Sequence, residues 1–389
     1  MSTATLADTG IIQITKACKA CDHCTSVCPT GAVKGLLGQK HSIDYKTCIN
    51  CGQCLINCPF GAIIDTSSVE QVKQALNDSG KTVIVQEAPA VRVALGEEFG
   101  MPVGTNVKGK MHAALRKLGF DKVYDTEFAA DLTIMEEGTE LIHRVFKLAG
   151  VAGYEDRGPL PQFTSCCPAW IKYAEDKYPA ILPHLSSAKS PQQMFGAIAK
   201  TYAANKQGVN PADMVSVSVM PCTAKKYECD RPEMKASGFQ DVDYVITTRE
   251  LATIIKDAGI DFVNLPDEEA DKLIGTSTGA ATIFGVTGGV MEAALRTAYE
   301  ILSGESLNKV EFTAVRGMQP VREATVEIPI KDLGINLPVN VCIVTGTKYV
   351  DKVIEDVLAG RSKYHFIEVM NCPGGCINGG GQPIRHEMY

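Results

Sequence analysis

The chain has 389 residues, a net charge of -7 and a pI near 5.6. Its lysines and arginines are dispersed, which argues against nucleic acid and anionic membranes as partners. No stretch reaches the roughly 18 apolar residues of a membrane span, and no basic region followed by an apolar run opens the chain, so we expect no membrane span and a cytoplasmic location. Fifteen cysteines in a chain of this length favour metal-binding thiolates over a disulfide scaffold.

Residues 8–66 contain a duplicated cysteine pattern. The spacing C-x2-C-x2-C-x3-C-P occurs at 18–29 and again at 48–59. In two-cluster bacterial ferredoxins this spacing holds two 4Fe-4S clusters, and the fourth cysteine of each repeat ligates the cluster of the other repeat. Zinc ribbons use paired knuckles instead of triplets, which disfavours two zinc sites. We therefore expect one cluster on Cys18, Cys21, Cys24 and Cys58, and a second on Cys48, Cys51, Cys54 and Cys28.

A linker helix is expected over residues 67–81, followed by a large α/β domain over 82–389. Alternating strands and helices predict mostly parallel sheets flanked by helices, and sites lie where such strands end. Strands are predicted at 82–85, 214–220, 242–247, 310–315, 340–345 and 365–370, and helices at 108–118, 132–149, 191–204, 249–258 and 289–302.

Three more cysteine boxes lie in this domain, at 164–168, 220–222 and 372–376. Four thiolates from three segments can enclose another cubane, and the glycines at 374, 375 and 379–381 leave space for a bulky cofactor. Buried structural cysteines would account for any one box, but not for all three together. Cys229 and Cys342 lie outside the pattern, and we expect them to be plain thiols.

The sequences Phe-Thr-Ser-Cys-Cys-Pro-Ala-Trp at 163–170, Met-Pro-Cys-Thr-Ala-Lys-Lys-Tyr-Glu at 220–228 and Glu-Val-Met-Asn-Cys-Pro-Gly-Gly-Cys at 368–376 resemble the three signatures of the FeFe hydrogenases. The resemblance covers nearly the whole chain. It implies a two-lobed α/β H-cluster domain behind an N-terminal α+β ferredoxin-like domain. It further implies a 4Fe-4S cubane on Cys167, Cys222, Cys372 and Cys376, with Cys376 bridging to a diiron unit that carries CO, cyanide and a dithiolate. The implied pocket residues are Ala88, Pro89, Gln192, Met220, Lys225 and Met370.

The same resemblance implies a proton path. In it Cys166 donates protons to the bridging amine as general acid and base, and the path continues to solvent through Glu137, Ser186, Glu140 and Arg144. On the predicted helix 132–149, the two glutamates and the arginine share one face. Spacing alone favours an ordinary solvated helix face with an ion pair, and only the resemblance favours a path.

The sequence thus predicts a hydrogenase that interconverts dihydrogen with two protons and two electrons, which pass through the two N-terminal clusters. A hydrogen sensor and a hydrogenase-like iron–sulfur assembly protein are the alternatives, and Cys166 and Lys225 favour the enzyme. The expected partners are a ferredoxin or small cytochrome as electron carrier, and maturation proteins. Because the chain stops six residues after Pro383, where single-chain relatives continue, a small hydrogenase subunit is also expected, which can bring export to the periplasm.

Overall fold

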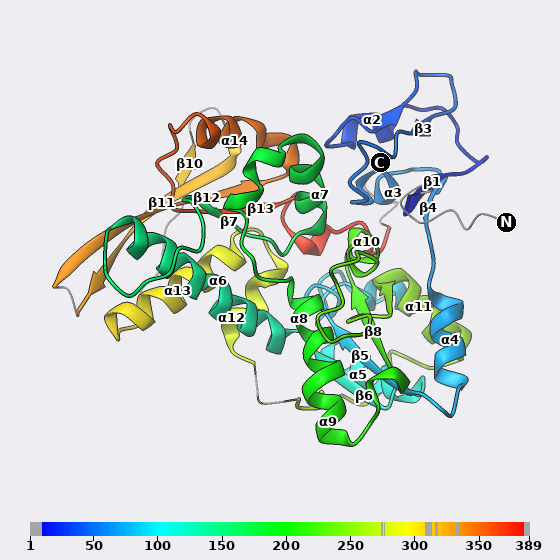
Figure 1. Ribbon diagram of the computed structural model, residues 1–389. Helices are drawn as coiled ribbons and strands as arrows, with labels where there is room; N and C mark the ends of the chain where they lie inside the picture. The colour runs from blue at the N-terminus through cyan, green and yellow to red at the C-terminus, as the bar shows by residue number, and fades with distance from the viewer. Residues whose placement is uncertain are drawn as a thin grey trace. The chain divides into compact units, whose positions relative to one another are not determined.

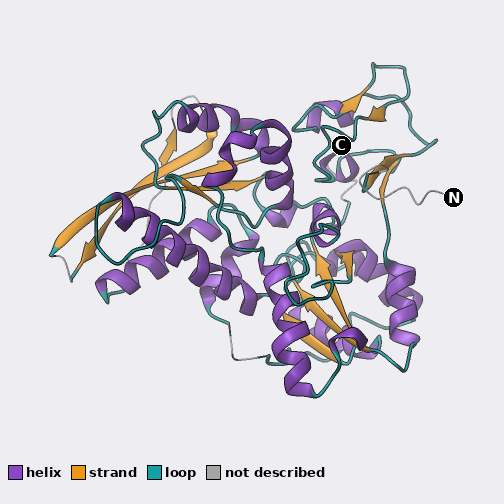
Figure 2. Cartoon of the chain, viewed as in Figure 1, coloured by secondary structure: helices purple, strands orange, loops and turns teal. Residues whose placement is uncertain are grey.

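The computed structural model describes residues 10–273, 275, 277–307, 313–315, 318–331 and 334–384 (Figures 1 and 2). Its contacts divide the chain into two compact units, each with its own sheet and hydrophobic core. Unit 1 comprises Met1–Ala129, Pro191–Ser277 and Cys376–Tyr389, and unit 2 comprises Ala130–Ser190 and Thr278–Gly375. The predicted first residue of the ferredoxin-like domain, residue 8, and the chain end at 385–389 lie outside the described residues.

The duplicated cysteine pattern folds into two matching loops within unit 1. In each loop the residues two and four positions after the first cysteine have positive φ: Ala20 (59°) and Asp22 (65°), then Asn50 (55°) and Gly52 (70°). Such left-handed residues turn the chain tightly, so closely spaced cysteines can face one point. The elements of this module are β1 (Ile12–Ile14) antiparallel to β4 (Ile63–Asp65), β2 (Val33–Lys34) antiparallel to β3 (Ser42–Ile43), α2 (His23–Val27) and α3 (Gln53–Ile56).

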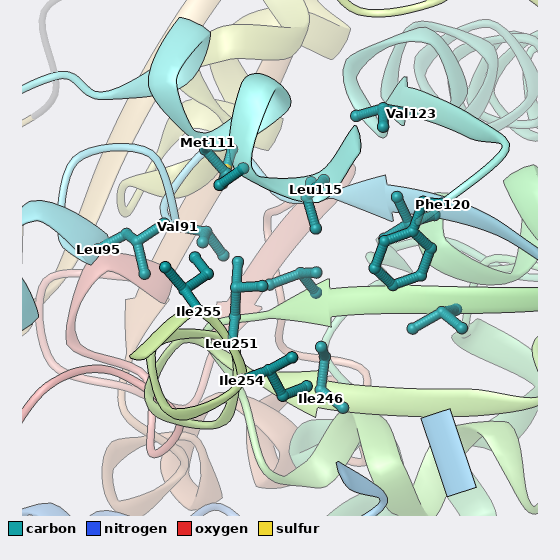
Figure 3. Close-up of a cluster of buried hydrophobic side chains, with 14 of the residues drawn as sticks. Val91, Leu95, Met111, Leu115, Phe120, Val123, Ile246, Leu251, Ile254 and Ile255 are labelled. Atoms are coloured by element: carbon teal, nitrogen blue, oxygen red, sulfur yellow. The ribbon is translucent and has the colours of Figure 1, made fainter. Parts of the chain in front are cut away.

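The larger part of unit 1 is a parallel four-stranded sheet with a hydrophobic core on each face. Its order is β6 (Lys122–Asp125), β5 (Thr82–Glu87), β8 (Met214–Met220) and β9 (Tyr244–Thr247). Side chains alternate across a strand, so Val83 and Val85 join one core while Ile84 joins the other. The first core also holds apolar residues of α4 (Val69–Asn77), α5 (Lys108–Lys117) and α11 (Thr248–Asp257) (Figure 3). The second holds α8 (Pro191–Ile198) and the π-helical turn Ala199–Ala203 that continues into α9 (Ala204–Gln207).

Unit 2 contains a mixed five-stranded sheet. Its order is β10 (Thr313–Val315), β11 (Met318–Ile330), β12 (Ile335–Thr345), β13 (Phe366–Met370) and β7 (Gln162–Phe163). The first three strands are antiparallel, whereas β12, β13 and β7 are parallel. Apolar residues of α6 (Glu127–Leu148) and α13 (Gly289–Ser303) form a core against this sheet. In Figure 1, α7 (Pro168–Lys177) and α14 (Asp351–Leu358) lie on the other side of the sheet.

The expected mostly parallel α/β architecture is confirmed, with one addition. The antiparallel strand β11 was not predicted; it contains Pro320 and Pro329, and proline within a run of residues argues against a strand. The short strands β6 and β7 and the helices α7, α10 (Ala224–Cys229) and α14 were also missed. Of the predicted strand 310–315, residues 310–312 lie outside the described residues.

Candidate functional site

The first of two four-cysteine cavities lies near the surface of the ferredoxin-like module. Its lining includes Lys19, His41 and Phe60 together with four thiols: Cys18, Cys21, Cys24 and Cys58. Cys21 is exposed to solvent. The fourth thiol comes from the second repeat, which is the grouping that crossed ligation requires.

The second cavity contains the complementary set of thiols: Cys28, Cys48, Cys51 and Cys54. Each cavity spans about 320 Å³ of space not filled by protein atoms, part of which is open to solvent. In the described part of the chain, no three His, Cys, Asp or Glu side chains are close enough to hold a single metal ion. Four thiols around one cavity are the donor set that a 4Fe-4S cluster requires.

The chemistry of these donor sets also suits iron–sulfur clusters. Burial, with smaller contributions from neighbouring thiols, raises the pKa of Cys24 to about 11 and that of Cys54 well above its usual range. Cys24 and Cys54 therefore resist ionisation without a compensating positive charge, which bound iron would supply.

The second cavity adjoins the segments that carry two of the later cysteines. A Cβ atom on Gly52 would lie 2.6 Å from Thr223 Oγ1 and 2.9 Å from the Cα of Gly380, and one on Gly380 would overlap the Cys51 carbonyl oxygen. Thr223 Oγ1 also donates to the carbonyl of Asn50 at 2.7 Å. Only glycines permit this approach of the second cysteine loop.

Within unit 1 the Cys222 and Cys376 segments lie together. Cys222 follows the end of β8, and the Gly381 N–H donates to the Pro221 carbonyl at 2.8 Å. The Gly379 N–H donates to the Cys376 carbonyl at 3.0 Å in the same turn. The carboxyl end of a parallel strand is where α/β sheets place their sites.

Lys225 and Gln192 meet at a carboxylate that was not among the predicted site residues. Lys225 Nζ lies 3.0 and 2.9 Å from the two carboxylate oxygens of Glu228, and Gln192 Nε2 donates to that carboxylate at 3.0 Å. All three residues are buried. The Gln192 Oε1 atom is buried without a hydrogen-bond partner among the described residues, which leaves it able to accept from a bound group.

The remaining predicted residues of unit 1 lie at the ends of neighbouring strands. Ala88 is buried directly after the end of β5. Its N–H donates to the Val219 carbonyl at 3.1 Å, and Val219 precedes Met220, the last residue of β8. Pro89 is half-buried. Unit 1 therefore brings Ala88, Pro89, Gln192, Met220, Cys222, Lys225 and Cys376 to one end of its parallel sheet.

Unit 2 places its own predicted residues where β7 and β13 end. These strands are parallel neighbours, with Phe366 paired to Gln162 and Ile367 to Phe163. The Cys166–Cys167 pair follows β7, and Cys372 follows β13. Cys167 occupies the N-cap position of α7, directly before Pro168. Cys166 is buried in an apolar cluster that contains Met370, Ile134 and Phe284.

Glu137 is fully buried beside this pair of cysteines. Its Oε1 accepts from the Ser165 backbone N–H at 3.2 Å. Burial raises the pKa of Glu137 to about 7, opposed by hydrogen bonds from Ser165 and Ser186. A carboxyl group with a pKa near neutrality can both take up and release a proton at physiological pH.

Glu140 continues this network one helical turn along α6. Its Oε2 accepts from Ser186 Oγ at 3.2 Å and from Ser187 Oγ at 3.0 Å, and its Oε1 accepts from Arg144 Nη2 at 2.5 Å. Arg144 also donates to the carbonyls of Pro159 at 2.8 Å and Leu185 at 2.9 Å. Glu140 and Arg144 are 4% and 3% exposed, so the alternative of a solvated ion pair is wrong.

Three residues of these sites were not predicted from the sequence. Glu228 stands three residues after Lys225, a spacing that is informative only in a helix, and α10 had not been predicted. Ser187 contacts Glu140 through tertiary packing. His41, whose Nε2 lies 2.9 Å from Asp22 Oδ1, lines the first cavity from a loop with no motif of its own.

The two cysteines set aside from the pattern are buried thiols. Burial raises the pKa of Cys229 well above its usual range and that of Cys342 to about 12. Cys342 lies within β12. Such thiols remain protonated and act as small apolar side chains.

The fold and these sites define an iron–sulfur oxidoreductase, and comparison with known proteins gives its family. Residues 81–380 match the family described as iron only hydrogenase large subunit, C-terminal domain, and residues 12–64 match the 4Fe-4S dicluster domain. The periplasmic Fe hydrogenase large subunit of Nitratidesulfovibrio vulgaris is 54% identical over 96% of this chain and 86% of its own length. A solved FeFe hydrogenase from Chlamydomonas reinhardtii gives a TM-score of 0.72 at 41% identity, over 82% of this chain and 85% of that chain. The chain belongs to the FeFe hydrogenase family.

Two further hydrogenase relatives are 50% identical, and the chain spans about half of their length. Iron–sulfur assembly proteins are more distant relatives. The cytosolic iron-sulfur assembly component 3 of Bos taurus is 31% identical over 81% of this chain and 65% of its own length. No helix within the described ranges has the length and apolar character needed to cross a bilayer.

Proposed function

We propose that this chain catalyses the reversible oxidation of dihydrogen to two protons and two electrons at an H-cluster. The observation that carries the proposal is the buried network of Cys166, Glu137, Ser186, Glu140 and Arg144 beside a cysteine box. Buried ionisable groups cost free energy of folding. A protein that only stored or transferred clusters would not need to move protons through its interior and so would not need such groups.

The cysteines that would hold the H-cluster cubane are proposed to be Cys167, Cys222, Cys372 and Cys376, of which Cys376 would also hold the diiron unit. Unit 1 brings the segments of Cys222 and Cys376 together, and unit 2 brings Cys167 and Cys372 to neighbouring parallel strand ends. When bound, the diiron unit supplies the metal chemistry that splits dihydrogen. Lys225, held by Glu228, would supply an ammonium group to a cyanide ligand of this cofactor. Gln192 would contribute its buried, unpaired Oε1 as an acceptor for the bound cofactor.

Electrons are proposed to pass through the cavities of the ferredoxin-like module in turn. The first cavity opens near the exposed Cys21, and the second adjoins Thr223 and Gly380 at the Cys222 and Cys376 segments. The two-loop arrangement therefore gives a continuous route within unit 1 from the surface to two of the H-cluster ligands.

Protons are proposed to move in unit 2 from Cys166 to Glu137 and onward through the Ser186 hydroxyl to Glu140. The Ser186 hydroxyl donates to Glu140 Oε2 at 3.2 Å and also lies near enough to Glu137 to affect the pKa of that carboxyl, so it can accept a proton from Glu137 while it donates to Glu140. Arg144 fixes the outer carboxylate at the end of the path. The raised pKa of Glu137 keeps its protonated and ionised forms close in free energy, as a proton relay requires.

A separate small subunit and a periplasmic location are also proposed. The relative at 54% identity is named as a periplasmic large subunit, and a large subunit implies a smaller partner. Native purification tests this, because a second, smaller chain should accompany the protein in a fixed ratio. Fractionation of the source cells should recover both chains outside the cytoplasm, and recovery of a single chain from the cytoplasm would contradict the proposal.

The main proposal is tested by isotope exchange. Protein matured with the diiron cofactor should exchange deuterium between D2 and water without any electron carrier, because exchange needs only the H-cluster and the proton path. The iron–sulfur assembly alternative predicts no exchange although all cubanes are present.

A further inference from the structure

A fully buried carboxylate, Glu368, lies in β13 a short distance before Cys372. Its Oε1 accepts from the Gly288 N–H and its Oε2 from the Met291 N–H, each at 2.7 Å. These donors belong to the start of α13, where the first N–H groups of a helix have no partner inside the helix. The carboxylate therefore ties the start of α13 to the strand that leads into the cysteine box at 372–376.

The segment before α13, residues 283–289, folds into a compact turn. The Val286 N–H donates to the Ile283 carbonyl at 3.2 Å, and the Gly289 N–H donates to the Val286 carbonyl at 3.1 Å. A Cβ atom on Gly289 would overlap the Ile283 carbonyl oxygen, so only glycine permits this conformation. The 283–289 turn ends at the N–H groups that Glu368 binds.

The 283–289 turn contacts the glycines of the cysteine box. The Thr287 N–H donates to the Gly374 carbonyl at 3.2 Å. A Cβ atom on Gly375 would lie 2.6 Å from the Thr287 nitrogen, closer than side-chain carbons approach. Arg322 Nη2 donates to the Thr287 carbonyl at 3.3 Å and holds the turn from β11. The two backbones are thus in direct contact, with no side chain between them.

These contacts close a ring within unit 2. From Glu368 the chain runs along β13 to Cys372 and on to Gly374. From Gly374 the ring returns through the hydrogen bond to Thr287, the peptide bond to Gly288 and the hydrogen bond to the Glu368 carboxylate. Because Cys372 lies within this ring, loss of the carboxylate would release one side of the turn that carries it.

We propose that Glu368 is a positioning residue for the H-cluster cubane, because it holds the 283–289 turn against the turn that carries Cys372. The residue acts through two backbone donors and is not a ligand. A carboxylate suits this role, since it offers an acceptor oxygen to each donor, whereas an amide side chain offers only one acceptor oxygen. The inference rests on the proposed function, because it concerns the cubane proposed for the four distal cysteines.

The test follows iron release to a chelator from the full chain, purified anaerobically without the diiron cofactor and held at pH 8. This pH lies above the pKa of Glu368, which burial raises to about 7, so both carboxylate oxygens accept. The variants are Glu368→Gln, which keeps one acceptor oxygen, and Glu368→Ala, which keeps none. The control is Asp241→Ala, which removes a buried carboxylate of unit 1 that accepts from the N–H groups of Ala236 and Ser237, each at 3.0 Å.

A second measurement separates geometry from stability. The same proteins are matured with the diiron cofactor, and the infrared bands of bound CO are recorded. These bands respond to the surroundings of the H-cluster, whereas a general loss of stability lowers their intensity without changing their positions or widths.

We expect wild-type protein to hold about twelve irons, about four in each of three cubanes. About four of them should be released about tenfold faster in Glu368→Gln and faster again in Glu368→Ala. The reason is that each buried donor without an acceptor raises the equilibrium for local opening by about that factor. Asp241→Ala should release its irons at nearly the wild-type rate.

The CO bands of matured Glu368→Gln should be broadened or split, and those of Asp241→Ala should match wild type. Iron release from Glu368→Gln no faster than from Asp241→Ala, or CO bands identical to those of wild type, would overturn the positioning role. Only about eight irons in wild type, with no CO bands after maturation, would instead overturn the proposed function.

Discussion

The carboxylate of Glu137 accepts a hydrogen bond from the backbone N–H of Ser165 at 3.2 Å, which fixes a fully buried ionisable group beside Cys166. Burial of an ionisable group costs free energy unless hydrogen bonds or a paired charge compensate for the lost hydration. The network beyond it, through Ser186 to Glu140 and Arg144, is buried along its length. We interpret this sequence of polar groups as the means by which protons cross an apolar interior.

Cys166→Ala should retain the iron content and the spectra of all clusters but reduce turnover by about 10²- to 10⁴-fold, because a positioned acid and base contributes about that factor. The readout is hydrogen evolution together with iron analysis. Cys229→Ala is the matched control, since it removes a buried thiol outside the cysteine boxes, and it should leave turnover near wild type. Substantial activity in Cys166→Ala would refute the role of this thiol.

Arg144→Met should destabilise unit 2 by about 3–5 kcal/mol, because it leaves the Glu140 carboxylate buried without its cation. Anaerobic denaturant unfolding measures the effect. Adding Glu140→Gln to Arg144→Met should recover part of the loss, as coupling in a double-mutant cycle requires. Arg157→Met removes an exposed pair with Glu155 and should cost less than about 1 kcal/mol. Equal effects of the two arginine substitutions would show that Arg144 is not a buried partner.

The proposed crossed ligation of the ferredoxin-like module predicts which substitutions share a phenotype. Cys58→Ala should eliminate the same electron paramagnetic resonance signal as Cys21→Ala, although the two residues belong to different repeats, because both line the first cavity. Cys28→Ala and Cys51→Ala should eliminate the other signal. Each variant should lose about four irons. If Cys58→Ala affected the same signal as Cys51→Ala, each repeat would hold its own cluster and the crossed arrangement would be wrong.

Glu368 provides a test of pH dependence away from the proton path. This fully buried carboxylate accepts from the backbone N–H groups of Gly288 and Met291, each at 2.7 Å, yet burial raises its pKa to about 7. The folded state therefore keeps a proton that the unfolded state loses near pH 4.5. The contribution of this group to stability is complete below pH 4.5 and is lost as the pH rises through 7.

Glu368→Gln removes this titration. Relative to wild type, its free energy of unfolding should rise between pH 5 and pH 8, by at most about 3 kcal/mol. Anaerobic denaturation of both proteins across this range measures the difference. Glu327→Gln, on an exposed position of β11, should show no such change with pH. A difference between Glu368→Gln and wild type that is constant with pH would show that the Glu368 pKa is not raised.

Local spacing predicted how the cysteines are grouped better than it predicted the residues around them. The two cysteine quartets follow from loop geometry that residues 18–28 and 48–58 encode themselves, and the structure groups them as expected. The shared face of Glu140 and Arg144 followed from helical periodicity, but their burial did not. It depends on the segment at 183–187, whose carbonyls and hydroxyls bind both side chains, and no local pattern indicates that packing.

Glu228 and His41 also could not be identified as site residues from local sequence patterns. Glu228 becomes informative only when α10 places it one turn from Lys225, and that six-residue helix lacks a periodic apolar signal. His41 reaches the first cavity because its loop folds back onto Ala20. His23, the other histidine of this module, opens α2.

The central claim is that this chain assembles an H-cluster, and infrared spectroscopy tests it most directly. The protein would be matured anaerobically with the diiron cofactor, and its spectrum recorded where bound CO and cyanide absorb, between the protein bands. We predict sharp CO and cyanide bands that shift under hydrogen, and weakened cyanide bands in Lys225→Ala. Absence of these bands in matured protein that contains all its cubanes would contradict the account.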